Sequence, residues 1–167
     1  MTNILIADSK GWFFSRFREE SGKHLAVTKI SEKESLTLDH LNTIKPKYIF
    51  FAHWSWIVAP EIHEKYECIV FHTAPLPFGR GGSPIQNLIS RGYKSAPVCA
   101  IRMSSKLDAG PIYLKEEISL DGRLDSIFER IFVATLKMIK KISLSTNLDP
   151  VEQEGDPLVF KRMTRED

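Results

Sequence analysis

Short runs of apolar residues alternate along the chain with stretches in which apolar positions recur every three or four residues. The first pattern is typical of buried strands and the second of amphipathic helices. Their alternation favours an α/β fold with a mostly parallel central sheet and flanking helices. The predicted strands cover residues 3–8, 25–30, 47–53, 67–72, 96–103 and 111–120.

The helix-like stretches fill the spaces between these strands. A long helix is predicted over 124–142, with an apolar face broad enough for the core and, as an alternative, for a homodimer contact. Ser83 is the expected N-cap of a helix that has Pro84 in its first turn and is closed by Gly92. The other helical segments are 12–21, 36–42 (a short helix or a turn) and 61–66.

No composition shift or linker divides the chain, so one domain over 1–167 is predicted, with a short polar tail from about residue 143. No apolar run approaches the length needed to cross a bilayer, and the first residues resemble a strand and not an export signal. Cys68 and Cys99 are isolated in apolar runs, which indicates buried thiols and neither a disulfide nor a metal site. A cytoplasmic protein without a membrane contact is expected.

The charges are nearly balanced, with a formal net charge of +2 at pH 7. Binding of nucleic acid through its phosphates needs a dense basic surface, so a nucleic-acid partner is not expected. The turn after the first strand, residues 8–12, lacks the glycine pattern of a dinucleotide site, and the chain has no phosphate-binding loop of the Walker type. These absences disfavour nicotinamide, flavin and nucleoside-triphosphate chemistry.

Polar residues follow three predicted strands, in segments 52–56, 72–77 and 104–110. Ligands of parallel α/β sheets collect at the carboxyl ends of the strands. A histidine beside a carboxylate from another loop forms a general acid/base pair, and His72 and Asp108 are the candidates. Taken alone, His72 is also compatible with a purely structural role at a strand end.

The loop 79–84 contains three glycines around Arg80. Glycines let the backbone approach a ligand closely, and a helix start attracts anions. Arg80 is a candidate bidentate partner of a carboxylate or phosphate. The alternative is a tight turn that only starts the following helix.

Taken together, residues 72–86 (HTAPLPFGRGGSPIQ) and 107–110 (LDAG) resemble the two motifs of the 10-formyltetrahydrofolate-dependent formyltransferases. That family includes methionyl-tRNA formyltransferase, glycinamide ribonucleotide transformylase and the sugar N-formyltransferases, and it has a Rossmann-like fold. The resemblance covers residues 48–120 well. The tail 160–167 is similar to the end of the catalytic domain in the sugar enzymes, which this chain resembles most.

The resemblance implies one-carbon transfer without a metal: an amine attacks the formyl carbon of 10-formyltetrahydrofolate. His72 and Asp108 are the implied catalytic residues. In the family the pterin is held largely by backbone groups. The implied folate-binding residues are Trp54, Ser55, Trp56, Ile57, Val58, Arg102, Met103, Ser104, Ser105 and Leu107, with a core role as the alternative for the two tryptophans. The expected substrate contacts are Lys10, Trp12, Arg80, Gly81 and Gly82.

One family residue is missing. The catalytic Asn belongs two positions before the histidine, where this chain has Val70. The amide that polarises the formyl oxygen is therefore replaced by His53, by a backbone group or a water, or by nothing, in which case the protein is a non-catalytic folate- or nucleotide-binding relative. A hydrolase that releases formate is a further alternative.

The expected acceptor is a small-molecule amine. A transfer-RNA acceptor is disfavoured by the net charge of +2 and by a chain that stops before the RNA-binding domain of the tRNA enzymes. The glycinamide ribonucleotide enzymes usually have a glycine-rich phosphate loop, whereas the turn after the first strand here holds a single glycine, so an acceptor of that type or another small amine is the alternative. The expectation is therefore an amino-sugar nucleotide or an activated nonulosonic acid for surface polysaccharide, with Arg80, Lys10 and Lys161 as anion partners.

Overall fold

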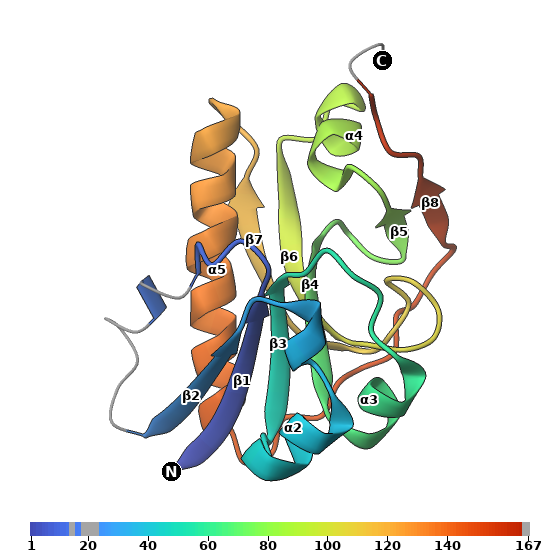
Figure 1. Ribbon diagram of the computed structural model, residues 1–167. Coiled ribbons are helices and arrows are strands. Elements are labelled where there is room, and N and C mark those ends of the chain that lie inside the picture. The colour runs from blue at the N-terminus through green and yellow to red at the C-terminus, as the bar shows by residue number, and fades with distance from the viewer. Residues whose placement is uncertain (14–15, 18–23, 165–167) are drawn as a thin grey trace. The chain divides into compact units, whose positions relative to one another are not determined.

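The computed structural model describes residues 1–13, 16–17 and 24–164 and has a mixed α/β fold (Figure 1). Six strands form the central sheet in the order β2-β1-β3-β4-β6-β7. The predicted fold class, a mostly parallel sheet with flanking helices, is confirmed. These strands are β1 (Thr2–Asp8), β2 (Leu25–Ile30), β3 (Tyr48–His53), β4 (Cys68–Thr73), β6 (Ser95–Arg102) and β7 (Ile112–Ser119).

The described residues fall into two compact units. Unit 1 comprises 1–70 and 139–148, and unit 2 comprises 71–138 and 149–167, of which 165–167 lie outside the described residues. The boundary lies within β4, between Val70 and Phe71, and the helix α5 (Leu124–Leu144) contributes residues to both units. The prediction of a single domain over 1–167 stays a prediction.

Unit 1 is built on parallel strands. β1 pairs in parallel with β2 and β3, and β3 pairs in parallel with the first residues of β4. The apolar runs Ile4–Ala7 and Ile49–Phe51 are buried, as expected for strands covered on both faces. The polar residues Asp8 and His53 stand at the carboxyl ends of β1 and β3. Shorter elements complete the unit: the 3₁₀ turn η1 (Lys33–Ser35), α2 (Leu38–Ile44) and α3 (Pro60–Lys65).

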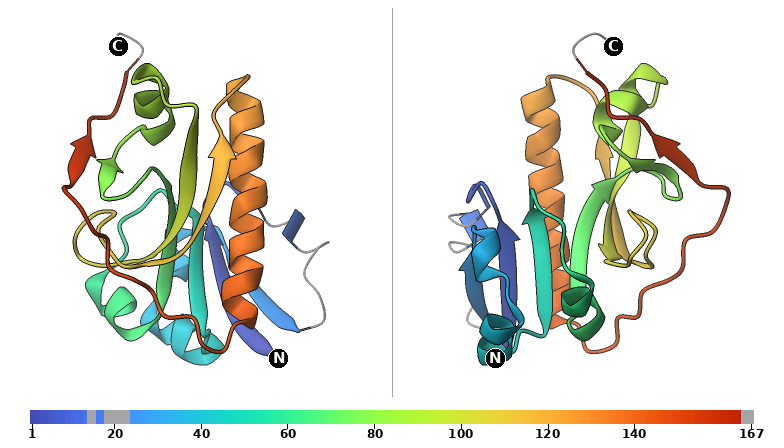
Figure 2. Two further views of the ribbon diagram at one scale, coloured as in Figure 1. Left: turned by 180° about the vertical axis from the view of Figure 1, so that it is seen from behind. Right: turned by 45° about the vertical axis from the view of Figure 1, so that its right-hand side comes forward.

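Unit 2 contains two kinds of strand pair. β6 and β7 are antiparallel, with Val98 opposite Glu116, so this edge of the sheet departs from the parallel arrangement. A second, two-stranded sheet joins β5 (Phe78–Gly81) in parallel to β8 (Leu158–Phe160), which Figure 2 shows side by side from two directions. The helix α4 (Pro84–Ser90) follows β5 directly.

Four local predictions need correction. Most of β5 lies in the expected loop 79–84, and the polar tail contains β8, because the two segments pair with each other across about eighty residues of chain. Ser83 precedes α4 but makes no side-chain cap, since its φ of 48° is left-handed and its Oγ instead accepts from the backbone N of Met163 at 3.0 Å. The long helix continues two residues further than expected, to Leu144.

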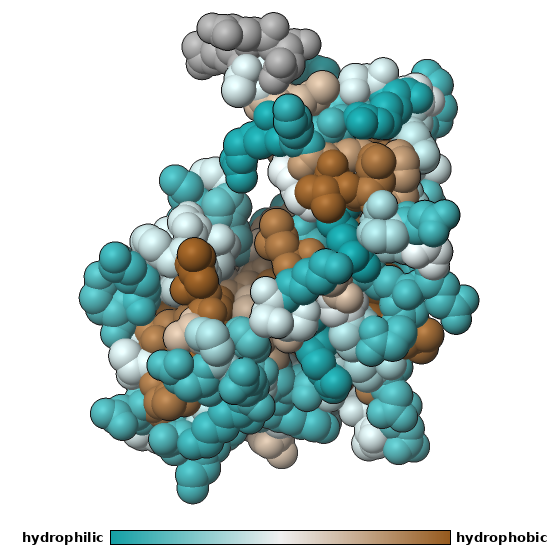
Figure 3. All heavy atoms as spheres, turned by 90° about the vertical axis from the view of Figure 1, so that its right-hand side faces the viewer, coloured by the Kyte–Doolittle hydropathy of each residue, from teal (hydrophilic) through white to brown (hydrophobic). Residues whose placement is uncertain are grey.

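Other local predictions are confirmed or lie partly outside the described residues. Cys68 and Cys99 are both free and buried. Of the helix predicted over 12–21, the described part includes one helical segment at 16–17. Among the described helices none is long and apolar enough to cross a membrane. The face of the molecule seen in Figure 3 is largely hydrophilic, with separate apolar patches.

Candidate active site

Unit 2 brings His72 and Asp108 together. His72 lies near the end of β4, and Asp108 lies in the loop that joins β6 to β7. Nδ1 of His72 is 3.6 Å from Oδ2 of Asp108, and the side chains are only 9% and 13% exposed. The separation is longer than a hydrogen bond, so the two side chains are in close approach without bonding directly.

A backbone contact fixes the tautomer of His72. Its Nε2 lies 2.7 Å from the carbonyl oxygen of Gly79. A carbonyl oxygen only accepts, so Nε2 carries the proton and Nδ1 is the nitrogen that gains or loses one. Nδ1 is also the nitrogen that faces Asp108. A proton donated by a ligand would therefore be received on Nδ1 of His72, the nitrogen that faces the carboxylate of Asp108.

The surroundings of Asp108 include two tightly packed glycines, Gly81 and Gly110. Asp108 has a left-handed φ of 52°, and its Oδ2 accepts a hydrogen bond from the backbone N of Gly81 at 3.0 Å. A Cβ on Gly110 would stand 1.8 Å from the carbonyl oxygen of Arg102, so position 110 has no room for a side chain. Gly81 itself has φ +97°, and a Cβ there would lie 2.7 Å from the carbonyl oxygen of Phe160.

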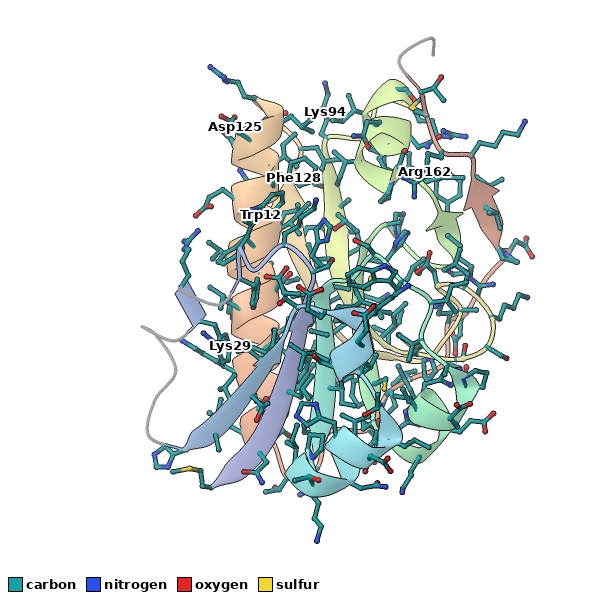
Figure 4. The ribbon with its side chains drawn as sticks, viewed as in Figure 1. Trp12, Lys29, Lys94, Asp125, Phe128 and Arg162 are labelled. Carbon is teal, nitrogen blue, oxygen red and sulfur yellow. The ribbon has the colours of Figure 1, made fainter. Side chains whose placement is uncertain are left out.

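The strand β8 and the residues after it pack against the glycine loop, residues 79–84. The Phe160 ring meets Phe78 edge-on with centroids 5.4 Å apart, and the Arg91 guanidinium lies 4.7 Å from its centroid. Nδ2 of Asn87 donates to the carbonyl oxygens of Gly82 at 3.2 Å and of Lys161 at 2.9 Å. Arg162, labelled in Figure 4, follows on the segment beside α4. These contacts hold the loop that bears Arg80 to a segment about eighty residues away.

Arg80, predicted to bind an anion, has a protein partner. Its Nε and Nη2 both donate to Oε1 of Gln153, at 3.1 Å and 2.8 Å. Nε2 of Gln153 donates in turn to the carbonyl oxygens of Asp108 and Gly110, at 2.8 Å and 2.9 Å. Sequence reasoning missed Gln153, because a glutamine between two glutamates in a polar tail carries no periodic or motif signal.

The predicted site residues at the start of the chain belong to unit 1. The Asp8 carboxylate is fully buried and accepts from the backbone N of Lys10 at 3.1 Å and of Phe13 at 2.7 Å, which fixes the turn after β1. Trp12, labelled in Figure 4, is 68% exposed and meets the exposed His53 ring edge-on at 5.7 Å. Lys10 is exposed. The turn therefore presents an exposed indole and imidazole at the carboxyl ends of β1 and β3.

The predicted folate segment after β3 carries an unused donor. The indole Nε1 of Trp54 is buried and has no hydrogen-bond partner among the described residues. Trp54 packs edge-on against Trp56 at 4.9 Å, and Ser55 bonds to Ser9 at 2.9 Å. Ile57 is 98% exposed, whereas Val58 is buried. Most of this segment is accessible to a ligand, so Trp56 and Ile57 do not belong to the core.

The second predicted folate segment, 102–107, lies in unit 2. Arg102 donates from Nη2 to the hydroxyl of Tyr113 at 3.0 Å, and Ser104 donates from Oγ to the carbonyl oxygen of Lys106 at 3.1 Å. Ser105 and Leu107 are exposed and Met103 is half-buried. Of the predicted site residues, unit 2 thus brings together His72, Asp108, Arg80 and Gly81 through hydrogen bonds and one close approach, and the 102–107 segment leads into this group.

Comparison with known proteins identifies relatives of the chain. Residues 9–131 match the family model described as Formyl transferase. Methionyl-tRNA formyltransferase of Rickettsia felis is 30% identical over an alignment of 137 residues that covers 78% of this chain and 45% of that protein. The chain spans about half the length of the curated relatives that it matches.

Solved structures have the same fold. A methionyl-tRNA formyltransferase from Clostridium thermocellum is 39% identical, with a TM-score of 0.90 over 99% of this chain and 74% of that one. The formyltransferase PseJ from Anoxybacillus kamchatkensis, solved with UDP-4,6-dideoxy-4-formamido-L-AltNAc and tetrahydrofolate, has a TM-score of 0.67 at 18% identity over 95% of this chain and 85% of that one. At such identity the second likeness shows the fold alone.

Proposed function

Because the chain belongs to the formyl transferase family, we propose that it transfers the formyl group of 10-formyltetrahydrofolate to a primary amine. The observation that carries the proposal is the approach of His72 and Asp108 to 3.6 Å in a largely buried setting. The two residues come from motifs 36 positions apart, and one proton-accepting nitrogen faces the carboxylate. The cytoplasm is the proposed location.

The residues proposed to hold the folate are those of segments 54–58 and 102–107. The fit of the first segment is supported by the buried Nε1 of Trp54, a donor without a partner among the described residues, beside the exposed Trp56 and Ile57. A planar pterin with carbonyl and ring-nitrogen acceptors suits such a donor and such aromatic surfaces. When bound, 10-formyltetrahydrofolate supplies the formyl carbon that the amine attacks.

The role of His72 follows from its contacts. A primary amine that forms an amide must lose one proton, and the folate nitrogen that is released must gain one. Nε2 of His72 is occupied by Gly79, so the proton of the amine is received on Nδ1. The negative charge of Asp108 stabilises the imidazolium and keeps the ring oriented until the proton is passed on.

His53 is the proposed substitute for the missing family amide. Position 70 has an apolar side chain that cannot donate a hydrogen bond, whereas His53 offers an exposed imidazole at the end of the neighbouring strand β3. A donor to the developing oxyanion is usually worth about 100- to 1000-fold in rate. His53 is therefore proposed as the third catalytic residue.

An amino-sugar nucleotide or activated nonulosonic acid is the proposed acceptor. The near-balanced charge of the chain supports a small substrate over a polyanion. Lys10 and Trp12 are exposed on the turn after β1, where a nucleotide's phosphate and base would find a cation and an aromatic ring. Gly81, Gly82 and Arg80 are the proposed contacts from the glycine loop.

Methionyl-tRNA is the second candidate acceptor. It is favoured by the 39% identity to the Clostridium thermocellum enzyme and by the match to the Rickettsia felis enzyme, both named for that substrate.

One assay separates these functions. The protein is mixed with 10-formyltetrahydrofolate and, in parallel, with amino-sugar nucleotides, charged methionyl-tRNA or buffer, and release of tetrahydrofolate is followed by absorbance. Release that depends on an amino sugar supports the proposal. Release only with methionyl-tRNA selects the second acceptor, release in buffer alone indicates a hydrolase, and folate binding without release indicates an inert relative.

A further inference from the structure

The side chain of Gln153 contacts both loops of unit 2 that form the His72–Asp108 pair. Its Oε1 accepts two hydrogen bonds from Arg80, on the glycine loop. Its Nε2 donates to the carbonyl oxygens of Asp108 and Gly110, at 2.8 Å and 2.9 Å. A guanidinium has only donors and a carbonyl only accepts, so the orientation of the amide is determined. One side chain therefore joins two loops that lie apart in sequence.

Asp108 needs such support. Its φ of 52° is an uncommon conformation for a residue with a side chain and persists only where the surroundings enforce it. Two sets of contacts surround the residue. The backbone N of Gly81 donates to the carboxylate of Asp108, and Nε2 of Gln153 donates to the backbone carbonyl oxygens of Asp108 and Gly110. The first set orients the carboxylate and the second holds the backbone that carries it.

We propose that Gln153 is a positioning residue for the transfer reaction. Its amide holds Asp108 in the left-handed conformation, so that the carboxylate accepts from Gly81 and faces Nδ1 of His72. Arg80 donates to Oε1 of Gln153 and so orients its amide. Arg80 therefore acts on Asp108 through Gln153. The kinetic part of this inference rests on the proposed function, whereas its geometric part is measurable on the protein without substrate.

The variant Gln153→Glu isolates the donor function. A glutamate has the same length and still accepts from Arg80, but it replaces the amide donor with an oxygen directed at two carbonyl oxygens. We expect kcat to fall roughly 10- to 100-fold, the usual effect of a small displacement of a catalytic group, with KM for both substrates little changed. Glu154→Gln, a substitution of the exposed neighbour, is the matched control and should keep the wild-type rate.

Hydrogen exchange of the Gly81 amide gives a readout that does not depend on activity. That amide donates to Oδ2 of Asp108, so its protection reports whether Asp108 is in place. Gln153→Glu should speed exchange at Gly81 by roughly 5- to 10-fold, the equivalent of one hydrogen bond, while the amide of Arg102, bonded to Pro111 in the same unit, keeps its protection. Asp108→Ala removes the acceptor of this hydrogen bond and so sets the upper limit for the increase in the exchange rate at Gly81.

The outcomes separate the two claims. A wild-type protein that transfers formyl to no amine overturns the proposed function, and the exchange experiment still decides the role of Gln153. Unchanged protection of Gly81 in Gln153→Glu overturns the positioning role, whatever the activity. If the charged variant does not fold, Gln153→Leu removes the same donor without adding a carboxylate, and the same change in Gly81 exchange is expected.

Discussion

Nδ1 of His72 lies 3.6 Å from Oδ2 of Asp108, although the two residues are 36 positions apart in the chain. The other ring nitrogen of His72 is bonded to the Gly79 carbonyl, and the carboxylate of Asp108 accepts from Gly81. Each partner is thus fixed by the backbone of the same glycine loop. The loop therefore orients both members of the pair that is proposed to move the proton.

The first prediction concerns the charge of Asp108. Asp108→Asn retains an oxygen that accepts from Gly81, but it removes the negative charge that stabilises a protonated His72. We expect kcat for formyl transfer to fall about 100- to 10,000-fold, within the range of general acid/base contributions. Asp156→Asn, at an exposed position, should leave kcat unchanged. Wild-type turnover by Asp108→Asn would remove Asp108 from the mechanism.

The second prediction concerns Gly110. In Gly110→Ala the new methyl group would stand 1.8 Å from the carbonyl oxygen of Arg102, so the β6–β7 loop must move. We expect the free energy of unfolding in urea to fall by about 3 kcal/mol or more, the upper end of overpacking effects, together with a loss of activity.

Gly92 is the matched control for this substitution. It has φ +85°, but no heavy atom lies within 4 Å of the Cβ position. Gly92→Ala should therefore lower the free energy of unfolding by only about 1–2 kcal/mol, the cost of a left-handed backbone at a residue with a side chain, and should keep activity. Equal losses in the two variants would show that the contact with Arg102 does not determine the need for glycine at position 110.

The third prediction follows from the two buried thiols. Burial raises the pKa of Cys68 to about 12 and that of Cys99 to about 11, from an ordinary value of 9.0. Between about pH 9 and these values the unfolded thiols ionise while the native ones stay protonated, so the free energy of unfolding falls as pH rises. The slope is at most about 1.4 kcal/mol per pH unit for each thiol.

Urea unfolding at pH 8, 9 and 10 measures this slope, and the Cys68→Ala/Cys99→Ala double variant should lose stability less steeply. Ellman's reagent at pH 8 should react slowly with the native protein and rapidly after denaturation. Rapid reaction of both thiols in the native state is the contrary outcome.

The fourth prediction tests what replaces the family asparagine. If His53 supplies the missing donor, His53→Ala should lower kcat about 100- to 1000-fold. Adding Val70→Asn to that variant should recover much of the loss, whereas adding Val70→Ala, which supplies no amide, should not. A His53→Ala variant with the wild-type kcat would leave a backbone group or water as the donor.

The sequence predicted the elements whose signals are local. β4 is an apolar run that ends near His72, and α5 has a helical apolar period, so both were foreseeable. Asp108 was expected from the resemblance of residues 107–110 to the second formyltransferase motif. The pairing of β8 with β5 was not, because three residues in a polar tail carry no periodicity and their partner is about eighty residues away.

Ser83 and Gln153 show the same limit at single residues. Serine before a proline favours a helix cap, but the left-handed backbone at Ser83 directs its hydroxyl to Met163 instead. Gln153 acquires its importance only when the tail reaches Arg80 and the Asp108 loop. Local sequence patterns suggested the candidate residues His72 and Asp108, whereas the contacts that position them are long-range and carry no local signal.

The most direct measurement is the amine-dependent release of tetrahydrofolate by His72→Gln. Glutamine can still donate to Gly79 but has no nitrogen that accepts a proton beside Asp108. With an amino-sugar acceptor that the wild type uses, kcat should fall about 100- to 10,000-fold, and the exposed-site control His24→Gln should match the wild type. An undiminished kcat in His72→Gln would contradict the claim that this imidazole and its carboxylate partner carry the reaction.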